Sequence, residues 1–439
     1  MVTGSNSIAI ARQNMKLLVP STGDVAEMRP RRQSLIMTFQ RLKKSTALLS
    51  VVCLFSIDAI SAQDVRSNES IRVATFNCSL NRNKAGELIS DLSGGADKQA
   101  QKVARILRTV RPQIVLLNEF DFDVDGKSIQ CFLSEYLSCK AEWAPEEPIE
   151  YRYHFSRPVN TGVPTGKDLD HDGKSDGPGD AIGFGRFAGQ YGMVVLSQFP
   201  INEAEARTFQ NLPWKSMPEA CLPPSGKDDN QMWYTADDLE ILRLSSKSHW
   251  DVPIQIQGQT LHILASHPTP PAFDGPEDRN GRRNHDEIRL WAEYLSADPK
   301  PWLVDDKGKS GPLTAEASFV ILGDQNADPH DGASYQTAIN QLLHHPRVNS
   351  EITPSSVGGV EAAKSQGGIN QQHRGDPTQD TADFNDRSVG NLRADYVLPA
   401  KTLKTTAAGI FWPRSTDPGA KLAECSDHRL VWIDVRMSH

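Results

Sequence analysis

The fold is decided by the stretch IRVATFN at residues 71–77 and by the two segments that follow it, KQAQKVARILRTV (98–110) and QIVLLN (113–118). The first and third are apolar runs of strand length. The second spaces its apolar residues at helical intervals and ends before Pro112. A strand, a helix and a second strand in this order predict a βαβ unit, and therefore an α/β fold.

The rest of the chain continues this pattern. Apolar runs predict strands at 192–197, 260–266, 318–322, 395–398 and 430–435, and periodic segments predict helices at 286–296 and 334–343. Stretches rich in Gly, Pro and Asp are interpreted as surface insertions, at 145–190, 210–230, 268–284, 298–316 and 350–392. Because no repeat is visible and no linker separates two self-sufficient halves, residues 63–439 are expected to form a single domain.

The first 62 of the 439 residues are interpreted as an over-extended start followed by a secretory signal. Arg41, Lys43 and Lys44 precede an apolar run at 47–57, and small residues then lead to a cleavage site after Ala62. This predicts a secreted or periplasmic protein, with a buried cytosolic helix as the alternative interpretation. The run is too short to cross a bilayer, and no later run approaches 18 apolar residues, so no integral membrane span is expected.

The net charge of the sequence excludes one class of function. The formal charge is −8; without residues 1–62, 39 basic residues face 52 acidic ones, a charge of −13. This balance argues against binding nucleic acid through a broad basic face, although local basic clusters remain possible.

The cysteines are interpreted in the light of export, because disulfide bonds persist outside the cytosol. Cys131 and Cys139 are eight residues apart and are the expected local disulfide. The sequence alone does not determine how the cysteines pair.

Polar residues stand at or just beyond the ends of most predicted strands, where α/β sheets place their ligand sites. Glu119 offers a carboxylate oxygen for a hard divalent cation. In Gly323-Asp324-Gln325-Asn326 the acid can orient a water nucleophile, and the amide can donate to phosphate oxygens. Taken singly, each such residue has a plainer explanation as a turn, a helix cap or a surface ion pair.

The order of these short polar motifs along the chain is more specific for one protein family than any single motif. It resembles the endonuclease/exonuclease/phosphatase superfamily, which has the deoxyribonuclease I-like fold. The resemblance runs from residue 71 to 435 and implies a four-layer α/β sandwich, with two mixed sheets face to face and helices outside. The pieces are Thr75-Phe76-Asn77, Asn118-Glu119-Phe120, Tyr191 to Ser197, Ser266-His267, Gly323 to Asn326, Arg393 to Leu398 and Ser426-Asp427-His428.

The resemblance also implies a metal site. Glu119 would be the principal ligand, helped by Asn77 and Asp427. The expected ion is Mg²⁺ or Mn²⁺, which would act as a Lewis acid and stabilise developing charge.

The remaining roles are carried over in the same way. Asp324 would position the attacking water, and Asn326 would stabilise the pentacoordinate phosphorus. His428 would be the general base or a phosphate contact and would be oriented by Asp395. His267 would be a candidate general acid for the leaving oxygen.

Two features are expected at the rim of this site. Tyr191 and an arginine cluster are candidate substrate contacts, because guanidinium groups suit phosphate. The alternative is a solvated helix start whose arginines pair locally. The cluster consists of Arg279, Arg282 and Arg283, with Arg289 further along.

The segment from Asp168 to Gly173 matches the opening of an EF-hand calcium loop. Asp168, Asp170, Asp172 and Asp176 would be the ligands, but Gly179 stands where the closing Glu belongs. A Ca²⁺ site with altered closure is expected here, and a solvated acidic turn is the alternative.

These observations favour a secreted, divalent-metal-dependent phosphoesterase that hydrolyses phosphate mono- or diesters by in-line attack of an activated water. A secreted DNA or RNA endonuclease with the same catalytic residues is the first alternative. A non-catalytic exported binding module is the second, but it would not need the whole ordered set. The substrate is expected to be a small molecule, a lipid headgroup or nucleic acid, and the oligomeric state is left open.

Overall fold

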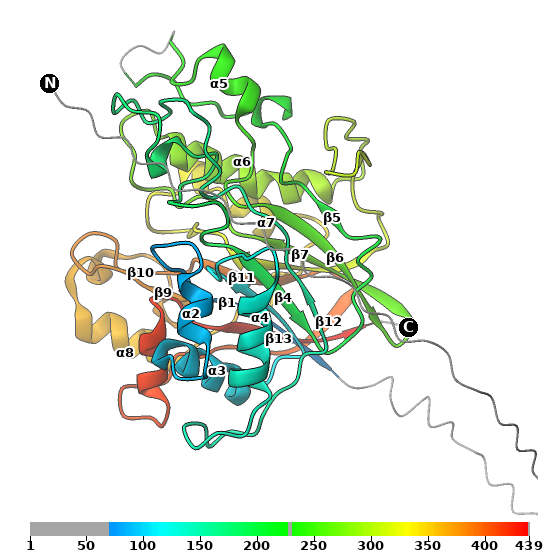
Figure 1. Ribbon diagram of the computed structural model, residues 1–439, viewed down its shortest axis with the longest axis vertical. Helices are drawn as coiled ribbons and strands as arrows, with labels where there is room; N and C mark the ends of the chain where they lie inside the picture. Colours follow the sequence, from blue (N-terminus) through cyan, green and yellow to red (C-terminus); the bar gives the residue numbers. More distant parts are fainter. Residues whose placement is uncertain (1–69, 227–230, 438–439) are drawn as a thin grey trace, which may run out of the picture. The chain divides into compact units, whose positions relative to one another are not determined.

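The computed structural model describes residues 70–226 and 231–437 (Figure 1). The predicted secretory signal and its cleavage after Ala62 lie outside the described residues, as does the beginning of the predicted domain 63–439. None of the helices in the described part of the chain has the length and hydropathy needed to cross a membrane.

The structure contains β-strands, α-helices, a π-helical segment and several short 3₁₀ helices. The strands are β1 Ile71–Asn77, β2 Ile114–Asn118, β3 Tyr153–Phe155, β4 Met193–Ser197, β5 Arg207–Thr208, β6 His249–Ile256, β7 Gln259–Ser266, β8 Ser318–Asp324, β9 Ala382–Asp383, β10 Asn391–Leu392, β11 Asp395–Pro399, β12 Leu403–Ile410 and β13 Val431–Met437. The α-helices are α2 Glu87–Leu92, α3 Lys98–Val110, α4 Lys127–Cys131, α5 Ala236–Ile241, α6 Arg279–Tyr294, α7 Asn340–Leu343 and α8 Val357–Gln366. A π-helical segment, Phe132–Leu137, continues α4, and 3₁₀ turns occupy Pro178–Asp180, Trp214–Ser216, Tyr335–Thr337, Gly368–Gln372, Pro377–Gln379 and Ala420–Cys425.

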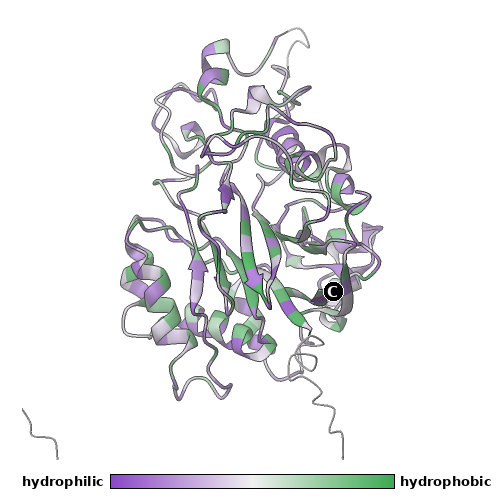
Figure 2. Cartoon of the chain, turned by 90° about the vertical axis from the view of Figure 1, so that its right-hand side faces the viewer, coloured by the Kyte–Doolittle hydropathy of each residue, from purple (hydrophilic) through white to green (hydrophobic). Residues whose placement is uncertain are grey.

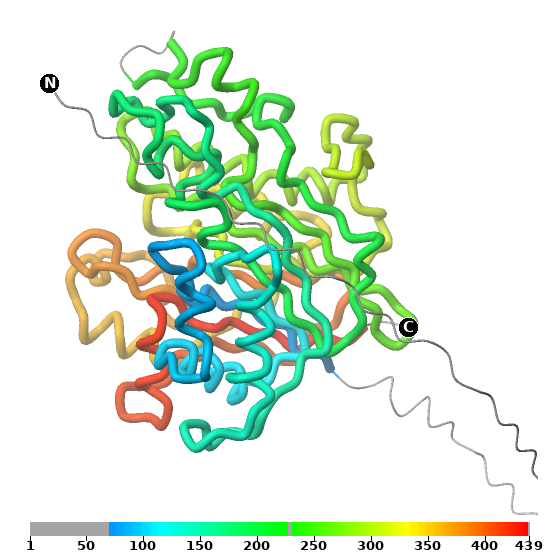
Figure 3. Tube along the Cα trace, viewed as in Figure 1, coloured from blue at the N-terminus to red at the C-terminus, as the bar shows by residue number. Residues whose placement is uncertain are grey.

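Two mixed sheets pack face to face. One has the order β12-β13-β1-β2-β4-β3 and the other β11-β8-β7-β6-β5, with β1 parallel to β2 and β7 parallel to β8. Helices α2, α3 and α4 cover the outside of the first sheet, and α6 packs on the second (Figure 1). The predicted four-layer α/β sandwich is therefore confirmed. Strands β1 and β13, from opposite ends of the described chain, lie side by side (Figure 3).

Alternation along β1 explains how the first sheet is buried on both faces. Ile71 and Val73 pack into the core between the sheets, whereas Ala74 and Phe76 pack into the core beneath the helices. Apolar residues therefore continue along the central strands (Figure 2). Because side chains alternate between the two faces of a strand, Asn77 points toward the second sheet, as Ile71 and Val73 do. It is the last residue of β1. The first polar side chain of the site is thus placed by the packing of an apolar strand.

Most predicted elements are present, with differences at their boundaries. Helix α3 has the predicted bounds, but α6 begins at Arg279 rather than at residue 286. The arginine cluster therefore lies in the first turns of a helix and not in a loop insertion. Strand β6 was not predicted, because its sequence HWDVPIQI carries a charge and Pro253, which break the apolar pattern. The edge strand β12 was also missed, because most of its residues are partly or fully exposed.

The expected bridge between Cys131 and Cys139 is wrong. Both thiols are free, as are the other three cysteines of the described residues. Helical backbone runs from Lys127 to Leu137. Because a helix advances ~1.5 Å per residue, it carries two cysteines eight positions apart beyond the ~4.4–6.8 Å that a disulfide spans between Cα atoms. The two thiols instead contact the Glu135 side chain and the Glu135 carbonyl oxygen.

Candidate active site

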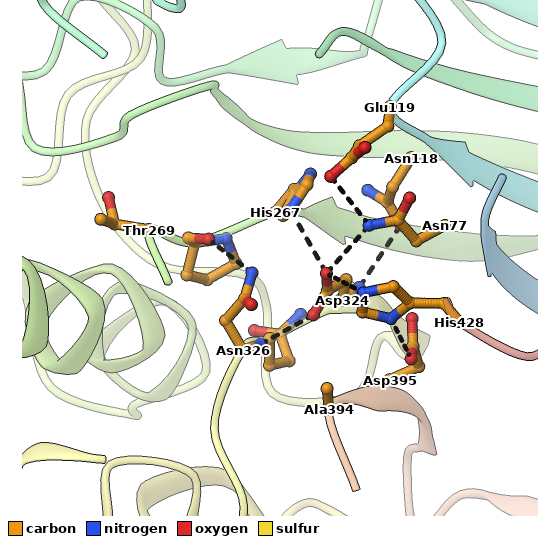
Figure 4. Close-up of polar contacts among 12 residues, drawn as sticks. Asn77, Asn118, Glu119, His267, Thr269, Asp324, Asn326, Ala394, Asp395 and His428 are labelled. Carbon is orange, nitrogen blue, oxygen red and sulfur yellow. Dashed lines mark hydrogen bonds and ion pairs between the residues drawn. The ribbon is translucent and has the colours of Figure 1, made fainter. Parts of the chain in front are cut away.

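The candidate site forms where the two sheets meet at the ends of β1, β2 and β8 (Figure 4). The Asn77 amide nitrogen donates to both carboxylates that face it, at 3.1 Å to Glu119 Oε1 and 3.1 Å to Asp324 Oδ2. Asn118 accepts from the Asp324 backbone N–H at 3.3 Å. The amides at the ends of two neighbouring strands thus join the sheets through the site.

Glu119 directly follows β2 and has a positive φ of 59°. Asn326, just after β8, has a φ of 52°. Such backbone conformations are uncommon for residues with a side chain, and they cluster at functional sites. Besides Asn77, Glu119 accepts from the Asn81 amide at 2.7 Å. Asn81 was missed by the sequence analysis, because it follows the end of β1 by four residues in irregular chain.

Asp324 is the centre of the group. Its Oδ2 lies 3.4 Å from His267 Nε2 and 3.5 Å from His428 Nε2, and its side chain is 1% exposed. Burial alone would favour the neutral acid. The charge of His428 and the hydrogen bond from His267 outweigh burial and hold the pKa of Asp324 below its usual range. Asp324 is therefore a buried carboxylate, and it can accept a proton or orient a water.

His428 lies between two carboxylates. Its Nδ1 is 2.8 Å from Asp395 Oδ2, which also accepts from the Thr381 hydroxyl at 2.9 Å. Burial opposes the charged imidazole, but Asp395 and Asp324 outweigh it and hold the pKa of His428 well above its usual value. Burial raises the pKa of Asp395 to about 6. Asp395 thus makes the contact with the His428 ring that its predicted orienting role requires, and Thr381 is a further support that the sequence analysis missed.

The two histidines differ in charge. Burial, followed by the nearby charge of Lys247, lowers the pKa of His267, and its Nδ1 has no hydrogen-bond partner. At neutral pH His267 is therefore neutral and His428 is protonated. This state suits the predicted phosphate contact of His428, whereas the predicted base role would first require that it lose its proton.

Lys247 is a third residue that the sequence analysis missed. It is buried, and the charges of Glu287, Glu119 and Asp324 act on it, although its ammonium group makes no ion pair with any described residue. Burial lowers the pKa of Lys247. When it is protonated, a buried lysine without an ion pair is able to attract a phosphate oxygen. No motif marked it, because it stands among serines before an unpredicted strand.

Asn326 bends back over the site. Its backbone N–H donates to Asp324 Oδ1 at 2.9 Å, and its amide donates to the Pro268 carbonyl oxygen at 3.1 Å. Asn326 and Asp324 are therefore adjacent, as the predicted pair of roles requires.

Asp427 and Tyr191 stand at the edge of the group. Asp427 is exposed and is linked to the site through Ser79, whose hydroxyl lies 3.5 Å from Asp427 Oδ1 and whose N–H donates to Asn77 Oδ1. Tyr191 has a φ of 56°, and its N–H donates to Asp121 at 3.0 Å. Burial and the charge of Glu119 raise the pKa of Tyr191. The predicted roles of both side chains stay predictions.

The structure does not bring the arginine cluster into the catalytic group. Arg283 is buried and donates to the carbonyl oxygens of Leu244 and Arg243, and Arg279 pairs with Glu277. Arg282 stacks on the Tyr335 ring at 4.7 Å. Two of the three guanidinium groups are thus used inside the protein, and their substrate-binding role stays a prediction.

The acidic loop gathers part of its predicted set. Asp168, Asp170 and Asp172 each offer an oxygen within 4.8 Å of the others, while exposed Asp176 is not part of that group. Asp168 Oδ1 is buried without a partner. Asp180, one position late for a closing ligand, accepts from the backbone N–H groups of Leu169 and Gly177. The calcium site stays a prediction.

The donor set of the catalytic centre fits a hard divalent cation. Glu119 accepts only from the amides of Asn77 and Asn81 and makes no ion pair with any described cationic residue. A half-buried carboxylate without an ion pair, beside a second carboxylate at Asp324, favours a bound cation. Glu119 would hold it together with oxygens of Asn77 and Asp427, and all these ligands are of the type that Mg²⁺ or Mn²⁺ prefers.

A buried carboxylate held by two histidines, next to an oxygen site for a divalent ion, is the arrangement of a metal-dependent phosphoester hydrolase. The family model "Endonuclease/Exonuclease/phosphatase family" matches residues 74–428. The chain therefore belongs to that family, and it is a metal-dependent hydrolase of phosphoric ester bonds. A search of curated protein sequences found no match.

Several solved structures are similar to this chain. One is an endonuclease/exonuclease/phosphatase from Beutenbergia cavernae DSM 12333, with 14% identity, 84% of this chain and 72% of that chain covered, and a TM-score of 0.44. A second is sphingomyelinase C from Streptomyces griseocarneus, with 15% identity, 83% and 99% covered, and a TM-score of 0.42. A third is the human Nocturnin catalytic domain, with 14% identity, 84% and 94% covered, and a TM-score of 0.39.

Proposed function

We propose that the protein is a secreted or periplasmic phosphoesterase that acts on small or lipid-linked phosphate esters. The observation that carries the proposal is Asp324, an ionised and buried carboxylate in contact with Asn77, His267 and His428. This geometry supports attack by a water that Asp324 orients. Localisation rests on the apolar run at 47–57 with its basic flank.

The residues divide the reaction between them. Asp324 accepts a hydrogen bond from the water and turns its lone pair toward phosphorus. The protonated His428 and the amide of Asn326 donate to phosphate oxygens as their charge grows. A divalent cation at Glu119, when bound, supplies Lewis-acid stabilisation of the same charge.

Charge favours a small or lipid-linked ester over nucleic acid. Nucleases draw much of their affinity from Lys and Arg contacts to the phosphate backbone. The chain without residues 1–62 carries a charge of −13, and Arg279 and Arg283 are engaged within the protein. Arg289 pairs with Glu293. A nuclease remains the second candidate, because Arg282 and Lys247 make no ion pair with any described residue.

The test is a substrate screen of the purified protein with Mg²⁺, Mn²⁺ and Ca²⁺ varied. DNA, RNA, sphingomyelin, inositol phosphates and sugar phosphates are compared, with Asp324→Asn as the matched inactive control. We expect metal-dependent phosphate release from a small or lipid-linked ester that the control loses. Faster cleavage of DNA or RNA than of every such ester would overturn the substrate proposal and favour the nuclease.

A further inference from the structure

A second group of metal-binding side chains lies outside the catalytic group, where α6 meets the segment before residue 226. Cys221 Sγ is 3.5 Å from His285 Nδ1, which is 3.1 Å from Asp286 Oδ1. The thiol also lies within 4.8 Å of an Asp286 carboxylate oxygen. One sulfur, one nitrogen and one oxygen atom thus lie within 4.8 Å of one another. None of the three side chains hydrogen-bonds to a catalytic residue.

The spacing of these atoms matches that of ligands around one tetrahedral ion. Zinc binds sulfur at ~2.3 Å and nitrogen or oxygen at ~2.0–2.2 Å, so a tetrahedral site separates sulfur from nitrogen by ~3.5 Å and nitrogen from oxygen by ~3.3 Å. The observed separations are 3.5 Å and 3.1 Å. These two separations are those expected of neighbouring ligands around one tetrahedral ion, and the third ligand pair, Cys221 and Asp286, also lies within 4.8 Å.

The carboxylate is held in the manner of a metal ligand. Asp286 Oδ2 accepts from the Trp214 indole N–H at 2.7 Å and from the Cys221 backbone N–H at 2.7 Å, and the side chain is fully buried. These two donors fix the carboxylate and leave Oδ1 turned toward His285. Outer hydrogen bonds of this kind orient metal ligands and are part of a working site.

We propose that Cys221, His285 and Asp286 bind a zinc ion, with a water completing the tetrahedron. A set of thiolate, imidazole and carboxylate suits a borderline-soft transition metal, unlike the oxygen and amide set at Glu119. Without the ion, burial and the neighbouring Asp286 raise the pKa of Cys221 to about 11. Zinc binding at neutral pH therefore displaces the thiol proton to solvent.

The site would act on the catalytic centre through α6. Asn284, next to His285, donates to the carbonyl oxygens of Thr269 and Gln325 at 2.8 and 2.9 Å. Glu287, next to Asp286, accepts from the Thr269 N–H at 2.6 Å. These contacts hold the two loops that follow His267 and Asp324. An ion at Cys221 would tie the segment before residue 226 to this helix and so support both loops.

The experiment uses the purified chain with excess Mg²⁺ and titrates Co²⁺, a spectroscopic substitute for Zn²⁺. We expect a thiolate-to-cobalt charge-transfer band, with one equivalent bound and displaced by Zn²⁺. Cys221→Ser should remove the band and weaken Zn²⁺ binding at least tenfold. Cys139→Ser is the matched control, because Cys139 is a partly buried thiol that contacts only the helix backbone and Arg108.

His285→Gln provides a second variant that keeps the thiol and should also weaken Zn²⁺ binding. Asp286 is left intact, since it supports Trp214. Absence of the band in the wild type, or an unchanged band in folded Cys221→Ser, would overturn the proposal. Because the readout is spectroscopic, it is independent of the substrate and of the proposed function.

Discussion

The catalytic centre and the acidic loop both bring several side chains with carboxylate or amide oxygens together, but they are built in opposite ways. At the centre, Asn77, Glu119 and Asp324 come from β1, the end of β2 and β8, and they are buried or half-buried. In the loop, Asp168, Asp170 and Asp172 come from five consecutive residues, and they accept hydrogen bonds from the backbone N–H groups of Asp172, Gly173 and Lys174. The first arrangement is imposed by packing. The second can form locally and is partly solvated.

This contrast has an energetic consequence. A buried carboxylate depends on its partners, because removing them leaves an uncompensated charge in a dry environment. A solvated carboxylate in a turn loses little when one neighbour changes. Substitutions at the catalytic centre should therefore lower turnover strongly. Substitutions in the acidic loop should lower only the thermal stability of the protein, and only when an ion is bound there.

The largest effect is expected for Asp324→Asn. The amide cannot take a proton from water, so turnover should fall by about 10²–10⁴-fold while KM changes little. Steady-state kinetics on the substrate found in the screen measures this, and a thermal melt confirms folding. Asp170→Asn in the loop is the matched control and should keep near-native turnover. Near-native turnover of Asp324→Asn would erase the proposed difference between the two regions.

The next effect concerns the metal. Chelation with EDTA should abolish activity, and Mg²⁺ or Mn²⁺ should restore it, because the centre offers oxygen ligands and no thiolate. Glu119→Gln should raise the metal concentration for half-maximal activity by at least about tenfold. Asn81→Ala, which removes only an amide that orients Glu119, should shift it less. A Glu119→Gln titration that overlays the wild type would place the principal ligand elsewhere.

A smaller effect is expected for Asp395→Asn. Asp395 acts through His428, whose Nδ1 it contacts at 2.8 Å, so turnover should fall by about 10–100-fold, less than for Asp324→Asn. In a double-mutant cycle, the same change should cost almost nothing once His428 is Ala. Additive losses in the cycle would instead give Asp395 a role that is independent of the histidine.

The smallest effect belongs to the acidic loop. If it binds Ca²⁺ only in the folded state, calcium at ~100-fold above Kd should stabilise the protein by about 2.7 kcal/mol. Melting temperatures across a calcium series, at constant Mg²⁺, compare the wild type with Asp170→Asn/Asp172→Asn. We expect the wild type alone to gain thermal stability. An equal gain in both proteins would leave the loop as a solvated acidic turn.

The sequence by itself determined the elements whose signals are local. Strand β1, helix α3 and strand β2 follow from apolar runs and helical spacing over short distances, and their order already requires an α/β sheet. The residues at strand ends, such as Glu119 and Asp324, could be selected because strand ends are where such sheets carry ligands. The acidic loop could be found because its residues are spaced within one turn-forming segment.

Only the tertiary structure decided which of these residues meet and in what charge state. Lys247 and Thr381 have no motif, and their relation to Asp324 and Asp395 comes from the folding of the chain around the sheet that contains β6, β8 and β11. The opposite charge states of His267 and His428 arise from burial and from neighbours far away in the chain. The prediction of a Cys131–Cys139 disulfide was wrong for a similar reason. The sequence gives only the number of residues between the two cysteines, whereas the helix that runs to Leu137 sets the distance between their thiols.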